Sequence, residues 1–109
     1  MKSGTGEEID DLLRKIDQNA SLQQIRRETA LLLLSCLDAR RETLDAWEKM
    51  HYEMAIALLP TVWLRLALTH VRMALDPPDE RPQLDDDKIR QFSALTAEQL
   101  VARLAPFRS

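Results

Sequence analysis

Glycine occurs only at positions 4 and 6, and its absence from the rest of the 109-residue chain strongly constrains the fold. Phosphate-binding loops and dinucleotide fingerprints need glycines where the backbone approaches phosphate, so kinase-like, GTPase-like and Rossmann folds are excluded. Tight β-hairpins favour Asn-Gly or Asp-Gly turns, and neither dipeptide occurs. Nineteen Leu and twelve Ala against three Val and five Ile favour helix over strand. We therefore expect one small all-α protein.

Composition also bears on the compartment of the protein. Hydrophobic residues make up 45% of the chain and charged residues 30%, a balance typical of a chain that buries a core. Cys36 is the single cysteine and the chain does not open with a signal peptide, so we expect a cytoplasmic protein. The most apolar stretch, residues 54–75, contains Pro60, Arg65 and Arg72. It is therefore predicted to be core, and no membrane association is expected.

Three helices are predicted in the first part of the chain, taken as one helical domain over residues 1–75. They cover about residues 7–18, 21–59 and 60–75. Ser21 and Gln24 have the spacing of a capping box, which marks a helix start. No Gly or Pro follows until Pro60, which suits the first turn of a new helix. The last of the three has a narrow polar strip and is expected to be the most buried.

The second predicted helix is the centre of the expected architecture. A continuous helix over residues 21–59 would be ~58 Å long, although Arg40, the one charge in its apolar stripe, makes a break near residues 38–41 the alternative. Shorter helices of the same chain cannot cover so long a stripe, so we expect a homodimeric helical bundle. The residues expected at this partner or dimer interface are Leu32, Cys36, Thr43, Trp47, Met50, His51, Met54 and Leu58.

The last third of the chain is predicted to contain a linker and a short helical segment. Residues 76–87 hold three of the five prolines and six acidic residues, a composition typical of an extended acidic linker. Residues 88–109 follow as a C-terminal helical segment, in which Thr96 and Gln99 have capping-box spacing. The pattern leaves open whether this segment packs on its own chain or on a second copy.

No catalytic residue and no cofactor is expected. Cys36 and His51 lie fifteen residues apart, ~22 Å along a continuous helix, so they cannot act together there. Glu48 and His51 have the i, i+3 spacing found in di-iron carboxylate bundles, but those bundles need two such motifs and further glutamates. A metal-carboxylate bundle is therefore our third hypothesis, and no metal site is assigned. We expect the lone His70 to be a hydrogen-bonded core residue.

Nucleic-acid binding is the alternative function. The basic pairs at residues 26–27 and 40–41 lie fourteen residues apart, about four helical turns, and could follow a phosphate backbone. Acidic residues alternate with them, however, and the formal net charge of the chain is −3. We therefore do not expect nucleic acid as the main partner.

The remaining signal is an apolar helical surface typical of protein-binding proteins. The pattern Met50-His51-x-x-Met54-Ala55, followed by a long apolar helix, resembles small all-helical dimeric antiactivators of LuxR-type quorum-sensing transcription factors. This resemblance covers about a dozen positions. It implies a non-enzymatic regulator that sequesters a transcription factor and blocks its dimerisation or its binding to DNA. From the residues alone, the expectation is a dimeric helical protein that inhibits or escorts another protein.

Overall fold

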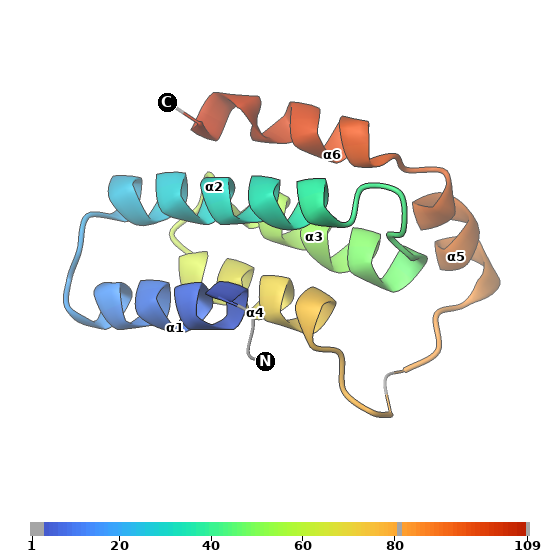
Figure 1. The fold of residues 1–109 in the computed structure, drawn as a ribbon, viewed down its shortest axis with the longest axis horizontal. Coiled ribbons are helices and arrows are strands. Elements are labelled where there is room, and N and C mark those ends of the chain that lie inside the picture. Colours follow the sequence, from blue (N-terminus) through green and yellow to red (C-terminus); the bar gives the residue numbers. More distant parts are fainter. Residues whose placement is uncertain (1–3, 81, 109) are drawn as a thin grey trace.

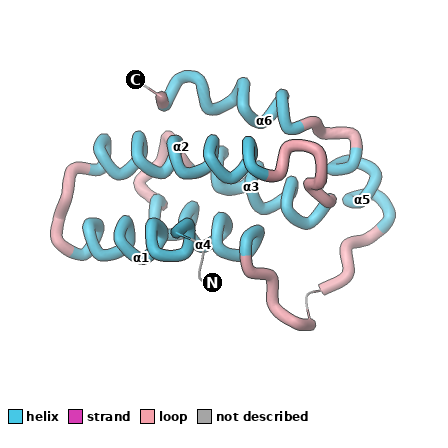
Figure 2. Tube along the Cα trace, in the orientation of Figure 1, coloured by secondary structure: helices cyan, strands magenta, loops and turns pink. Residues whose placement is uncertain are grey.

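The computed structural model describes residues 4–80 and 82–108, and these residues form helices without any strand (Figures 1 and 2). The α-helices are α1 (Gly4–Asp17), α2 (Leu22–Ala39), α3 (Ala46–Leu58), α4 (Leu64–Leu75), α5 (Asp86–Ser93) and α6 (Ala97–Leu104), and a 3-10 turn (Ala105–Phe107) follows. The predicted all-α fold is thus confirmed. Within the described ranges, every helix is too short or too polar to cross a membrane.

The helices form two antiparallel hairpins with further helices packed against them (Figure 1). One hairpin is α1–α2 and the other is α3–α4. Helix α4 lies beside both α1 and α2, and apolar residues of both hairpins meet in one core. Tyr52 of α3 and Leu33 of α2 are completely buried there.

The C-terminal helices pack on their own chain. Helix α6 lies along α2 and α3, and its Leu100 and Leu104 belong to the main core. Helix α5 packs against α3 and contributes Phe92 to a second, smaller apolar cluster. Leu84, in the segment predicted to be an extended linker, packs against the same cluster. The described residues of that segment are non-helical up to Asp85, and α5 begins at Asp86, two residues before the predicted start of the helical segment; Arg81 lies outside the described residues.

The prediction of one continuous helix over residues 21–59 is wrong, and the chain breaks close to the alternative position. Helix α2 ends at Ala39 and α3 begins at Ala46. Asp45 caps α3, because its carboxylate accepts a hydrogen bond from the Glu48 amide at 2.8 Å and its own amide donates to the Glu48 carboxylate at 3.3 Å. This reciprocal capping box satisfies two backbone amides at a new helix start. The Asp-x-x-Glu spacing that carries it is visible in the sequence.

The helix predicted over residues 60–75 starts four residues later than expected. Pro60 is part of a turn between α3 and α4 rather than the first residue of α4, which begins at Leu64. The Thr61 hydroxyl donates to the Leu58 carbonyl at 2.6 Å and accepts from the Trp63 amide at 3.0 Å. The Arg26 guanidinium donates to the Leu59 and Thr61 carbonyls from α2. Side chains therefore bind the backbone groups that a continued helix would have used.

Removing the cap at the break should destabilise the whole fold. We expect Asp45→Ala to lower the free energy of unfolding by about 1 kcal/mol or more, because the Glu48 amide then loses its acceptor at the start of α3. Urea denaturation measures this change. Glu42→Ala, an exposed carboxylate removed from the same turn, is the matched control and should change the stability by less than about 0.5 kcal/mol. Equal effects of the two substitutions would contradict the capping role.

Candidate protein-interaction surface

Most of the residues predicted at an interface are used inside the chain. Leu32 and Cys36 are buried in the main core, and Trp47 and Met50 are buried in the cluster with Phe92. His51 is also buried, while Leu58 is half-buried against the core. Thr43 lies exposed in the turn before α3, and Met54 is exposed on α3 itself. Helices α4, α5 and α6 cover the apolar stripe that we expected a second copy to cover.

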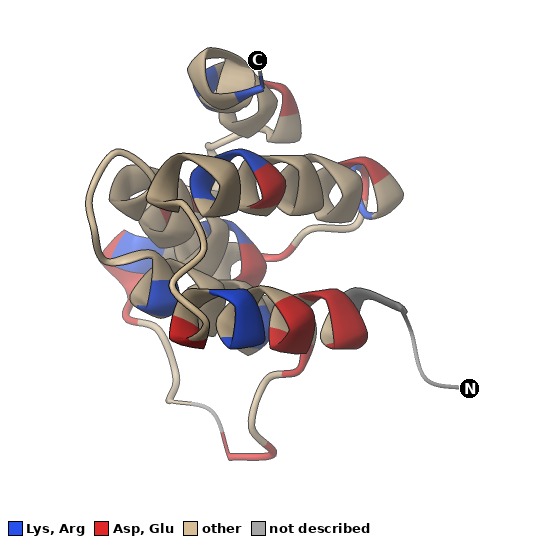
Figure 3. Cartoon of the chain, turned by 90° about the vertical axis from the view of Figure 1, so that its left-hand side faces the viewer, with Lys and Arg blue, Asp and Glu red and all other residues tan. Residues whose placement is uncertain are grey.

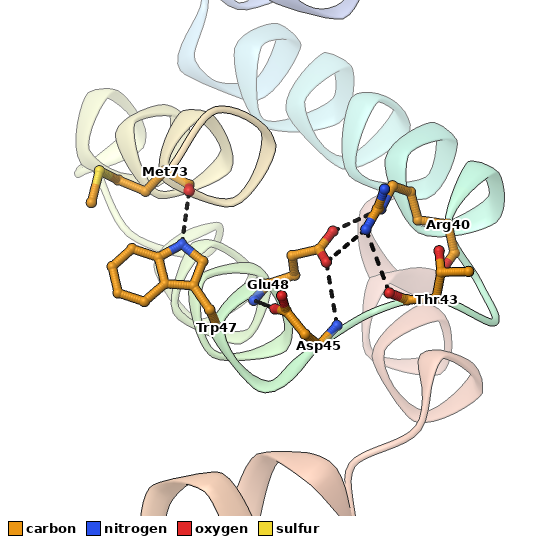
Figure 4. Close-up of polar contacts among 6 residues, drawn as sticks. All are labelled: Arg40, Thr43, Asp45, Trp47, Glu48 and Met73. Atoms are coloured by element: carbon orange, nitrogen blue, oxygen red, sulfur yellow. Dashed lines mark hydrogen bonds and ion pairs between the residues drawn. The ribbon is translucent and has the colours of Figure 1, made fainter. Parts of the chain in front are cut away.

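Glu48 is held in a structural network at the break between α2 and α3 (Figure 4). Its side chain is only 8% exposed, and its two oxygens accept from the Arg40 guanidinium at 2.8 Å each. A buried carboxylate needs a charged partner, and a bidentate guanidinium–carboxylate contact is among the strongest ion pairs. The neighbouring Trp47 indole donates to the Met73 carbonyl at 2.9 Å, which ties α3 to α4.

The Glu48-x-x-His51 spacing therefore does not converge on one point. Glu48 binds Arg40, whereas His51 faces His70 across the α3–α4 hairpin. Among the described residues, no three His, Cys, Asp or Glu side chains gather in a way that could hold a metal ion.

His51 and His70 form a direct hydrogen bond. Their Nδ1 atoms are 3.0 Å apart and their ring centroids 5.2 Å apart, so the two nitrogens point toward each other between the rings. One ring must therefore carry its proton on Nδ1 and the other must accept it. The Nε2 atom of His51 is buried and has no hydrogen-bond partner among the described residues. Because a buried N–H without an acceptor is costly, we assign the shared proton to Nδ1 of His51.

This arrangement favours neutral rings. Burial lowers the pKa of His51, and the proximity of His70 lowers it further; burial also lowers the pKa of His70. A proton added to His51 would go to its buried Nε2, and a proton added to His70 would displace the hydrogen bond at its Nδ1. The pair therefore joins α3 to α4 in its neutral form, as a second polar contact between these helices besides the Trp47–Met73 hydrogen bond.

Cys36 is packed in the main core. The thiol is buried, and burial raises its pKa to about 11 although the Tyr52 hydroxyl beside it has the opposite effect. Burial likewise raises the pKa of Tyr52. A thiol that stays protonated at neutral pH is a poor nucleophile. The polar neighbour of the thiol is the Tyr52 hydroxyl. The imidazole of His51, which could act as a base, forms its hydrogen bond with His70 and not with the thiol.

Large apolar side chains are exposed along the α3–α4 hairpin. We define the hairpin patch as Met54, Val62, Trp63 and Leu66, which are 43%, 67%, 64% and 45% exposed. The contact between His51 and His70 fixes the register of the two antiparallel helices. Met54 lies one turn after His51 and Leu66 one turn before His70, so these two residues stand at the same level. Val62 and Trp63 follow in the connecting turn.

The hairpin patch contradicts the expectation that residues 60–75 are the most buried helix. An exposed tryptophan beside three other large apolar side chains is unusual for a surface that only faces water. Of the patch, sequence analysis identified only Met54 as an interface residue. The available signal was the spacing of Trp63, Leu66 and His70, which places them on one side of α4, away from Leu64 and Leu68 in the core.

Most of the arginines pair with acidic residues. Arg41 binds Asp38 and Glu98, Arg65 binds Asp17, and Arg72 binds Asp10. In Figure 3, basic and acidic residues occur on the same helices, close to one another. Cations paired in this way have little free charge for a phosphate backbone, so the geometry gives no support to the nucleic-acid alternative.

The histidine pair predicts a destabilisation by mild acid. Because both folded pKa values lie below the ordinary value of about 6.5, the unfolded chain binds more protons than the folded chain in this range. The contribution of the neutral pair to the free energy of unfolding is complete above pH 6.5. It is lost as the pH falls from there through the pKa values of the two histidines in the folded protein. Unfolding free energies at pH 7 and pH 5.5 measure the loss.

A double variant isolates this effect. In His51→Phe/His70→Phe, the decrease in stability between these two pH values should be clearly smaller than in the wild type. If both proteins lose the same stability on acidification, the paired histidines are not its source.

Comparison of this chain with protein-family models, with curated proteins and with solved structures finds no match.

Proposed function

We propose that this protein is a non-enzymatic binding protein that holds a partner protein at the hairpin patch. The observation that carries the proposal is Trp63, 64% exposed on the same hairpin as three other exposed apolar side chains. Tryptophan buries a large area with few rotatable bonds, and it is enriched among residues that dominate binding energies. The partner presents an apolar recess that receives this side chain, with Met54 and Leu66 filling the contact around it.

The groups that could carry catalysis support a binding role, because each has a structural partner. The Cys36 thiol has a raised pKa in the core, and the Glu48 carboxylate is bound by Arg40. The two histidines bind each other through Nδ1. A nucleophile, a base and an orienting group within mutual reach are the minimum for covalent catalysis. These side chains stabilise helix contacts instead.

A transcription factor of the LuxR type is the specific partner that we propose from the resemblance around residues 50–55. Met50 and Ala55 of that pattern are buried and His51 pairs with His70, whereas Met54 belongs to the hairpin patch. The exposed member of the pattern is thus part of the proposed docking surface. Sequestration by this patch would act by covering an apolar surface that the transcription factor needs for its own dimerisation.

A homodimer through the same patch is the competing occupant. The sequence-based argument for a second copy was an uncovered long helix, and the chain covers that stripe itself. The hairpin patch is the apolar surface that this coverage leaves open on α3 and α4. We therefore place the partner protein there, and the test below separates the two occupants.

Introducing a charge into the patch should abolish partner binding without unfolding the protein. Purified wild type, Trp63→Asp and Ile89→Asp are used as baits in extracts of the native host, and retained proteins are identified by mass spectrometry. Ile89, 41% exposed on α5, is the control for a charge on an exposed apolar side chain outside the patch. We expect a protein, predicted to be a transcription factor, to be retained by the wild type and by Ile89→Asp. Its affinity for Trp63→Asp should fall by about 30-fold or more, since loss of a central aromatic contact costs ~2 kcal/mol.

Equal retention by Trp63→Asp would contradict the proposed docking surface. Sedimentation equilibrium of the same three proteins tests the other occupant. A wild-type dimer that becomes monomeric only in Trp63→Asp would assign the patch to a second copy, and the proposed partner binding would be wrong.

A further inference from the structure

A second surface feature, separate from the hairpin patch, lies between α1 and α2. It is a groove of about 370 Å³ lined by Glu8, Asp11, Leu12, Glu28, Leu31, Leu32 and Ser35. It continues past Glu28 and Leu31 into a hollow lined by Ser21, Gln23, Gln24 and Arg27. We call the first part the α1–α2 groove. It shares no residue with the hairpin patch, so conclusions about the two surfaces are independent.

The register of the hairpin gives the groove a defined layout. Lys15 of α1 binds Glu28 of α2 at 2.9 Å, and the two helices run antiparallel. Counting back along α1 and forward along α2 from this contact places Glu8 level with Ser35. The carboxylates of Glu8 and Glu28 therefore mark the two ends of the groove, separated by seven residues, or ~10 Å along the helix axes.

Apolar side chains lie between these two carboxylates. Leu12 and Leu32 are buried and form the floor, while Leu31 is 45% exposed in the middle of α2. An exposed leucine between two carboxylates suits an apolar side chain flanked by basic ones. The leucines alone would bind an apolar ligand of any charge, whereas the carboxylates favour a basic one.

The charge of the groove is negative and incompletely neutralised. Asp11 pairs with Arg14 and Lys15, and Lys15 also neutralises one oxygen of Glu28. The other oxygen of Glu28, Oε2, is buried and has no hydrogen-bond partner among the described residues. In Figure 3, α1, the helix next to the N label, carries acidic residues over its N-terminal half, where Glu8 lies. Glu8 is exposed and the Glu28 side chain is 33% exposed, so both carboxylates are accessible to a basic ligand.

We propose that the α1–α2 groove binds a basic amphipathic helix. Two basic residues spaced i, i+7 lie on one face of a helix and about as far apart as Glu8 and Glu28. Apolar residues at i+3 and i+4 of that face then contact Leu31 and the floor of the groove. One basic side chain pairs with the exposed part of the Glu28 carboxylate, and the other pairs with Glu8.

A designed peptide tests this proposal. The probe is an alanine-based helical peptide with lysines seven residues apart and leucines at the third and fourth positions after the first lysine. Isothermal titration calorimetry should show binding to the wild type that weakens as salt is raised. Replacing both lysines of the peptide by glutamine should weaken binding at least tenfold.

Protein variants locate the site. Glu8→Gln/Glu28→Gln should weaken binding of the lysine peptide at least tenfold, whereas Asp38→Asn/Glu42→Gln removes the same charge outside the groove and should leave the affinity within twofold. Glu8→Gln alone, a change at an exposed residue that leaves the Lys15–Glu28 pair intact, should weaken binding at least threefold. Circular dichroism confirms that each variant is helical.

Three results would overturn the proposal: no binding of the peptide by the wild type, equal binding by groove and control variants, or a wild-type dimer that Glu8→Gln/Glu28→Gln converts to monomer. The last would assign the groove to a second copy. Trp63→Asp should bind the peptide like the wild type, so failure of the groove proposal and failure of the proposed function are distinguishable.

Discussion

The pairing of Arg40 with Glu48 at the break between α2 and α3 is the interaction on which the rest of the fold depends. Glu48 is buried, so its carboxylate needs a cation and donors within reach. Arg40 supplies both oxygens with partners, and the Asp45 amide adds a third contact that also caps α3. Together these contacts end one helix and start the next with a change of direction. Removing Arg40 would leave the buried Glu48 carboxylate without a cation, whereas removing Glu48 would cost less because the Arg40 side chain is 47% exposed and can be hydrated.

The change of direction allows the chain to cover its own apolar stripe. Helix α3 runs in the opposite direction to α2 (Figure 1), α4 packs on both α3 and α2, and α5 and α6 pack on α3 as well. Trp47 and Met50, which would have remained open on a continuous helix, pack against Phe92. Met54 lies one to two turns further along the same face and remains exposed. The boundary between the core and the exposed hairpin patch is thus set by how far α5 reaches along α3.

The local parts of this fold can be read from the sequence more reliably than the exposed surface. Capping at Thr96 follows from residue types and spacing, because the interaction is completed within four residues. The Asp45–Glu48 box was equally readable, but an apolar stripe across residues 21–59 without any Gly or Pro favours a continuous helix when periodicity alone is considered. Arg40 interrupts that stripe, and its role depends on a carboxylate eight residues away that becomes close only after the chain turns.

Whether an apolar side chain is buried or exposed depends on contacts between helices that are far apart in the sequence. Trp47 and Met54 have the same helical azimuth, yet one is buried and the other exposed, because Phe92 and Met73 cover the first. The pairing of His51 with His70 likewise depends on the register of two helices. A single apolar stripe therefore predicts which face of a helix is used, but not whether its own chain or a partner covers it.

The exposure of Trp63, in contrast to the burial of Trp47, is the central claim, and acrylamide quenching of tryptophan fluorescence tests it most directly. Trp47→Phe leaves Trp63 as the only tryptophan, and Trp63→Phe leaves Trp47. The structure predicts strong quenching and red-shifted emission from Trp63, unchanged over a range of protein concentrations, and weak quenching of Trp47. Equal protection of both tryptophans, or protection of Trp63 that grows with protein concentration, would contradict an open hairpin patch on this chain.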